Sequence, residues 1–93
     1  MKDKLVKVVK SKKEGKKYTA VFQSGKETSF GAKGYEDFTQ HKDENRKRLY
    51  RKRHQKDLKP KDPRRAGYLS MEILWSKPTL KEGIKHYKQK YNM

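Results

Sequence analysis

Residues 18–30, YTAVFQSGKETSF, decide how this chain folds. In the first part of this stretch Tyr18, Ala20 and Phe22 occur at every second position, so a β-strand places all three apolar side chains on one face. The Ser-Gly pair that follows is typical of a tight hairpin turn. Residues 26–30, KETSF, are therefore predicted to return as the next strand.

One more strand is predicted before this hairpin. Residues 5–9, LVKVV, are rich in β-branched side chains, and residues 11–16, SKKEGK, have the composition of a turn. Three strands joined by short turns predict an antiparallel meander with one face open to water.

Helices are predicted in the second half of the chain. Asp43 is a suitable N-cap for a helix that runs to about residue 58. Ser70 is placed to cap a short helix over residues 71–75, and Pro78 prevents that helix from continuing.

Thr79 and Glu82 have the spacing of a capping box, which opens a last helix. This helix carries an apolar stripe that we expect to pack on the chain's own sheet or on another subunit: Leu80, Ile84, Tyr87 and Tyr91. The predicted fold is α+β. It is a single small domain over residues 1–93, with an N-terminal three-stranded antiparallel meander followed by two to three helices.

The aromatic residues of the N-terminal half fit two roles. On a sheet they can form a platform on which bases stack, as in single-strand binders. Because only 30% of the residues are hydrophobic, we expect these rings mainly to build the core. They are Tyr18, Phe22, Phe30, Tyr35 and Phe38, and Trp75 is expected to be buried beside Pro78.

Arginine is confined to one part of the chain. All six arginines lie between residues 46 and 65, whereas lysines occur throughout, and the formal net charge is +16. The guanidinium group matches phosphate oxygens two at a time and stacks on bases. A chain with so much positive charge is destabilised unless anions lie nearby, and nucleic acid is the commonest such partner.

We therefore expect binding to nucleic acid, to DNA rather than RNA, through phosphate contacts that tolerate any sequence. The candidate binding residues are Arg46, Lys47, Arg48, Arg51, Lys52, Arg53, Arg64, Arg65, Lys12, Lys13, Lys16 and Lys17. On the predicted helix, Arg48, Arg51, Lys52 and Gln55 are expected on the outer side. A second group shares another side: Arg46, Leu49, Tyr50, Arg53 and Asp57.

Each basic cluster also has a simpler interpretation. A charged helix face is usually no more than a solvated surface. Residues 59–65, KPKDPRR, are rich in turn-forming residues and are expected to be flexible, as are residues 1–4. The lysines of residues 12–17 can equally protect the edge of a hairpin from aggregation.

The sequence points to a binding protein and not to an enzyme. It contains no nucleophile elbow, no phosphate-cradling glycine loop and no metal-binding signature. Cysteine is absent, and His41, His54 and His86 have no zinc-type spacing, so we expect no metal and no cofactor. There is no apolar run long enough for a membrane span or a signal peptide.

Several short segments together resemble a family of small basic proteins encoded by large nucleocytoplasmic DNA viruses of algae and protists. The resemblance runs from about residue 18 to residue 84, and residues 41–43 and 75–80 are its most specific parts. The segments are residues 30–32 (FGA), 34–35 (GY), 37–39 (DFT), 41–43 (HKD), 53–54 (RH), 66–68 (AGY) and 74–80 (LWSKPTL).

The family's usual segment rich in tryptophan or phenylalanine is represented here by residues 68–73, YLSMEI. The resemblance implies a viral source and a virion component. Because no signal-peptide run is present, we expect the protein in the virion or in the interior of the infected cell, nucleus or cytoplasm, and not secreted. It transfers no catalytic residue. Two functions are consistent with it: compaction or coating of viral DNA, or a small structural component of the virion that contacts other virion proteins through its basic surface and tyrosine stripe.

Overall fold

The predicted meander is present. The computed structural model describes residues 3–59 and 61–91 and contains three antiparallel strands in the order β1-β2-β3. Strand β1 spans Leu5–Lys10, β2 spans Lys16–Phe22 and β3 spans Glu27–Ala32.

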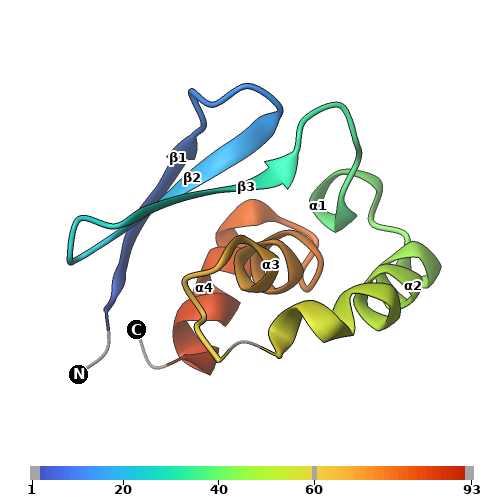
Figure 1. Ribbon diagram of the computed structural model, residues 1–93. Coiled ribbons are helices and arrows are strands. Elements are labelled where there is room, and N and C mark those ends of the chain that lie inside the picture. The colour runs from blue at the N-terminus through green and yellow to red at the C-terminus, as the bar shows by residue number, and fades with distance from the viewer. Residues whose placement is uncertain (1–2, 60, 92–93) are drawn as a thin grey trace.

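The helices follow the sheet in sequence. Figure 1 shows α3 and α4 beneath the sheet, whereas α2 lies beyond α1 at the side of this layer. The α+β prediction is therefore confirmed. The elements are α1 (Phe38–His41), α2 (Glu44–His54), the 3-10 helix η1 (Gln55–Leu58), α3 (Ala66–Leu69), the π-helix η2 (Ser70–Leu74) and α4 (Leu80–Lys90).

One face of the sheet forms one side of the core. Ala20, Phe22 and Phe30 are fully buried there, as the two-residue period predicted. A bulge between Leu5 and Lys7 breaks the period in β1. Because of this bulge, Leu5 and Val8 both reach the core although they are three positions apart.

Two of the three predicted N-caps are confirmed. The Asp43 carboxylate accepts from the backbone N–H groups of Asn45 at 2.9 Å and Arg46 at 3.3 Å. The Thr79 hydroxyl accepts from the N–H of Glu82 at 3.1 Å. Each side chain thereby satisfies amides that the first helical turn leaves unpaired.

The predicted cap at Ser70 is wrong. The helix begins earlier, at Ala66, and Ser70 lies inside a continuous α-to-π segment with helical backbone angles. Nearly every side chain from Tyr68 to Trp75 is buried, so packing against the sheet and α4 determines where this helix begins. A surface cap therefore has little influence here.

Gly83 permits the close contact between α4 and η2. A Cβ atom at this position would lie 2.0 Å from the carbonyl oxygen of Ile73, which is backbone and has little freedom to move. The apolar stripe of α4 packs into the same layer: Tyr87 is fully buried, while Leu80, Ile84 and Tyr91 lie against the core. The stripe therefore packs within its own chain.

The aromatic residues are mostly buried, as expected, with one exception. Phe22, Phe30, Phe38 and Trp75 are buried and Tyr18 is half-buried against the core, but Tyr35 is 75% exposed. In residues 3–59 and 61–91, no helix combines the length and apolar character needed to cross a membrane.

Candidate functional site

Helix α2 presents three faces with different partners. Its inward face carries Arg51, whose Nη1 donates to the carbonyl oxygen of Met71 at 2.9 Å and to Glu72 Oε1 at 3.2 Å. The same nitrogen lies 3.4 Å from the carbonyl oxygen of Trp75. The prediction that Arg51 lies on the outer side is therefore wrong, and its guanidinium joins α2 to η2.

Glu72 is the centre of this contact. Its side chain has no exposed surface, and Arg51, His86 and Lys90 all lie within ion-pair distance of it. Burial alone would raise the pKa of the Glu72 carboxyl. The hydrogen bond from Lys90 and the charges of Arg51 and Lys90 outweigh that effect and hold the pKa below its usual value.

Two lysines among the predicted binding residues also have internal partners. Lys17 Nζ lies 2.7 Å from a carboxylate oxygen of Asp37, which ties β2 to the start of α1. Lys47 Nζ donates to the carbonyl oxygen of Ser76 at 2.8 Å and lies 4.8 Å from the centroid of the Phe38 ring. Both side chains hold elements together, and their ammonium groups are directed at partners within the fold.

Arg64 is neutralised in the same way. Its guanidinium lies 3.1 Å from Asp62 and 3.1 Å from Asp3, and it donates hydrogen bonds to both carboxylates. A hydrogen bond from Ser24 is the main cause that lowers the pKa of Asp3, and one from Arg64 is the main cause for Asp62.

These contacts bear on the two segments that were expected to be flexible. Asp3 and Asp62 both accept from Arg64, and the hydroxyl of Tyr87 donates to the carbonyl oxygen of Pro63. Residues 1–2 and 60, which belong to the same expectation, lie outside the described part of the chain.

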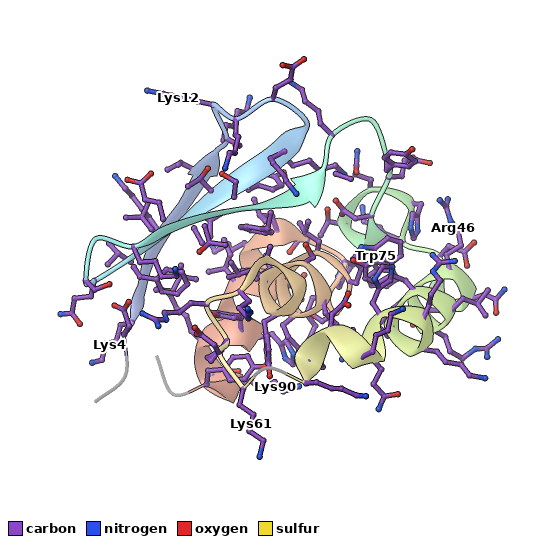
Figure 2. All side chains as sticks on the ribbon, viewed as in Figure 1. Lys4, Lys12, Arg46, Lys61, Trp75 and Lys90 are labelled. Carbon is purple, nitrogen blue, oxygen red and sulfur yellow. The ribbon has the colours of Figure 1, made fainter. Side chains whose placement is uncertain are left out.

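The cations of α2 that are free to contact a ligand lie on the two faces of the helix that are turned toward solvent. Arg48 is exposed and donates to the neutral amide oxygen of Asn45 at 2.7 Å. Lys52 and Arg53 are exposed and form no ion pair within residues 3–59 and 61–91. Arg46, which Figure 2 shows at the outer edge of the molecule, faces only Glu36, at 3.7 Å and with both side chains about half exposed.

A cleft of about 640 Å³ lies between the side of α2 that carries Arg46 and Arg53 and the end of the sheet. Arg46, Leu49 and Arg53 line its α2 wall, and Lys16 and Ala32, which pair across β2 and β3, line the opposite wall. The helical spacing had grouped the α2 residues on one side, and that prediction is confirmed.

Small residues make the space for this cleft. Gly31, Ala32, Ala66, Gly67 and Ser70 all line it. A Cβ atom on Gly31 would lie 2.9 Å from the Leu74 side chain, and its φ of +81° also disfavours other residues. The absence of a side chain at Gly31 therefore lets β3 lie close to Leu74 of η2.

Each acidic side chain that lines the cleft forms a hydrogen bond or an ion pair within the protein. Asp37 accepts from Lys17 and from the amide of Thr39 at 2.9 Å, and Asp57 lies 2.9 Å from Nδ1 of His54. Glu36 faces Arg46, as described above. Among the described residues, Lys16 and Arg53 are the cations of the cleft that form no ion pair.

An aromatic stack forms the wall behind these charges. Trp75 and Tyr50 are parallel within 5°, with ring centroids 4.0 Å apart, and His54 follows at 4.2 Å from Tyr50. All three rings line the cleft, and Figure 2 shows Trp75 between α2 and the neighbouring helices. The exposed ring of Tyr35 lies on the same cleft.

The predicted binding lysines in and beside the β1–β2 turn lie in different places. Lys12 and Lys13 are exposed at the β1–β2 turn, and Figure 2 shows Lys12 at the opposite side of the view from Arg46. Lys16 lines the cleft with α2. Arg65 is exposed on the segment before α3. The predicted binding residues therefore do not form one continuous patch.

The histidines lie in separate places. The Nδ1 atom of His41 accepts from the amide of Asp43 at 2.9 Å, and Nδ1 of His54 lies 2.9 Å from a carboxylate oxygen of Asp57. His86 lies 3.5 Å from Glu72 and is only partly exposed. Across residues 3–59 and 61–91, no three histidine, aspartate or glutamate side chains converge as metal ligands do.

Tyr35 is the residue of the cleft that sequence reasoning missed, because it was assigned to the core. The sequence carries one signal, Gly31 and Gly34 before it, which favours a loop here, and the structure gives both glycines a positive φ, although neither shows that a cleft lies beside Tyr35. An aromatic side chain on such a loop is free to face solvent.

Comparison with known proteins gives one match. No curated protein and no solved structure matches the chain. A model described as a family of unknown function, DUF5754, matches residues 6–54, from β1 to the last residue of α2. This span is more than half of the 93 residues, and the chain therefore belongs to the DUF5754 family.

Proposed function

We propose that this protein binds nucleic acid through phosphate contacts made by the two solvent-facing sides of α2. The observation that carries the proposal is the set of exposed cations there that have no buried acidic partner: Arg46, Arg48, Lys52 and Arg53. Arg65 and the lysines of the β1–β2 turn, Lys12, Lys13 and Lys16, add further positive surface.

The spacing of these cations suits a phosphate backbone. Arg48 and Lys52 lie one helical turn apart, which is about 6 Å along a helix, and Arg46 and Arg53 flank the neighbouring side. Phosphates repeat regularly along a nucleic-acid strand, so cations spaced along one helix can contact more than one of them. Such contacts set affinity and position but do not select a sequence.

The resemblance to small proteins of large DNA viruses supports viral DNA as the nucleic acid that is bound. We propose that the polymer is DNA of such a virus and that the protein compacts or coats it in the virion or the infected cell. A structural role in the virion is less favoured, because the tyrosine stripe assigned to subunit contacts packs into the chain's own core.

The test is a filter-binding titration of duplex and single-stranded DNA across a series of salt concentrations. With about four phosphates engaged by these α2 cations, the logarithm of the affinity for duplex should fall against the logarithm of the salt concentration with a slope of about −4. An affinity that does not change with salt would remove the proposal.

A further inference from the structure

We propose that the cleft between α2 and the end of the sheet binds a nucleobase carried on a sugar phosphate, as an unpaired base of a single strand presents it. This inference rests on the proposed function and adds to it: the outer side of α2 binds backbone, while the cleft binds the base. The ligand of the cleft is then a planar aromatic ring with an attached negative charge.

The size and lining of the cleft suit such a ligand. A volume of about 640 Å³ falls in the range of small-molecule sites, roughly 300–1,000 Å³. The small side chains of Ala32, Ala66 and Ser70 leave room for a flat ring, and Leu49, half exposed, gives an apolar edge. A duplex cannot enter a space of this size, so the base must be unpaired.

The charges of the cleft suit the attached phosphate. Asp37 lies beside Lys17 and Glu36 faces Arg46. The lining carries four cations against three carboxylates, so it is net positive: Lys16, Lys17, Arg46 and Arg53 against Glu36, Asp37 and Asp57. Lys16 and Arg53 remain without acidic partners on opposite walls. Either cation can contact a phosphate oxygen while the base lies between the walls.

The aromatic residues suit the base. Both faces of the Tyr50 ring are covered, by Trp75 and His54, so Tyr50 supports the wall and does not offer a free face. Tyr35 is the ring with free surface: it is 75% exposed, and no aromatic neighbour stacks on it within the described residues. An exposed tyrosine beside unpaired cations is the arrangement by which proteins stack bases of a single strand.

The experiment compares two single strands of equal length and charge, a short oligothymidylate and an oligomer that contains abasic sites in place of every base. Binding is measured by fluorescence anisotropy of a labelled strand. We expect the oligothymidylate to bind roughly tenfold more tightly, which is the size of effect that one base stacked on an aromatic ring produces.

Variants of Tyr35 assign that difference to the cleft. Because Tyr35 is exposed, replacing it should not unfold the chain. Tyr35→Leu should bring the two strands to equal affinity while binding to the abasic strand stays unchanged. Tyr35→Phe, which keeps the ring, should preserve the difference.

The outcomes separate this inference from the proposed function. Equal binding of both strands by the unaltered protein contradicts the base site and leaves phosphate binding standing. Failure to bind either strand contradicts both. A difference that persists in Tyr35→Leu also contradicts the inference, because the base is then bound elsewhere.

Competition by free thymidine monophosphate identifies the source of the base. If the monophosphate displaces the labelled strand at a concentration close to that of the strand itself, the ligand is a free nucleotide. If displacement needs a large excess of monophosphate, or does not occur, the cleft takes the base of a strand.

Discussion

Arg48 and Arg51 are one helical turn apart on α2, and yet they have different roles. Arg51 faces inward and binds the buried carboxylate of Glu72, whereas Arg48 faces solvent and binds only the amide of Asn45. The inward side of α2 holds the helix to η2, and the outward sides leave charge for a ligand. The position of an arginine relative to the core therefore decides whether its charge serves the fold or a partner.

The largest expected effect concerns the inward side. Glu72→Gln removes the negative charge that Arg51, His86 and Lys90 surround, and leaves those cations with a neutral amide. We expect the free energy of unfolding to fall by about 3 kcal/mol. Urea denaturation followed by circular dichroism measures this loss, and an unchanged midpoint would show that the cluster does not hold the fold.

The next effect compares the two arginines directly. Arg51→Gln should lower the free energy of unfolding by about 2 kcal/mol, because Glu72 loses one partner but keeps Lys90. Arg48→Gln is the matched control on the exposed face and should change it by less than about 0.5 kcal/mol. Equal losses in the two variants would break the distinction between the two sides.

A smaller effect is expected from acid. The folded protein holds the pKa of Glu72 below its usual value, so its contribution to stability is full above the unfolded pKa and is lost as pH falls through the folded pKa. The unaltered protein should therefore lose more stability than Glu72→Gln between about pH 5 and about pH 3. Asp3 and Asp62 titrate in both proteins and cancel in the difference. Parallel pH curves for the two proteins would contradict the role of Glu72.

The smallest effect on stability is expected from the outward side. Arg48→Gln and Lys52→Gln together should leave the thermal unfolding midpoint almost unchanged, because neither side chain binds a buried group. A clear decrease would show that these cations belong to the fold. Their loss should instead weaken binding to DNA.

Local patterns predicted much of this structure. Alternation in residues 18–22 located the central strand, and Asp43 located the start of α2, because both signals act over a few residues. The helical spacing of Arg46, Leu49 and Arg53 also grouped the residues that line one wall of the cleft.

Long-range contacts were not predictable in the same way. Arg51 faces inward because Glu72, twenty-one residues later, is buried where α2 meets η2. The only bulky apolar side chains in the middle of α2 are Leu49 and Tyr50, and Leu49 is 48% exposed, so the apolar stripe did not show which side faces the core. Tyr35 was assigned to the core for a related reason, since nothing in its neighbours shows that the cleft lies beside it.

The most direct test of the account compares two variants that lose equal charge. One has Arg46, Arg48, Lys52 and Arg53 changed to glutamine, and the control has the same change at Lys4, Lys7, Lys81 and Lys85, exposed lysines on or next to β1 and α4. Each variant lowers the formal net charge from +16 by 4, to +12. Affinity for a labelled DNA duplex is then measured for both at one moderate salt concentration. The α2 variant should bind about tenfold or more weakly than the control. Equal affinity of the two variants would contradict the claim that the solvent-facing sides of α2 bind the phosphate backbone.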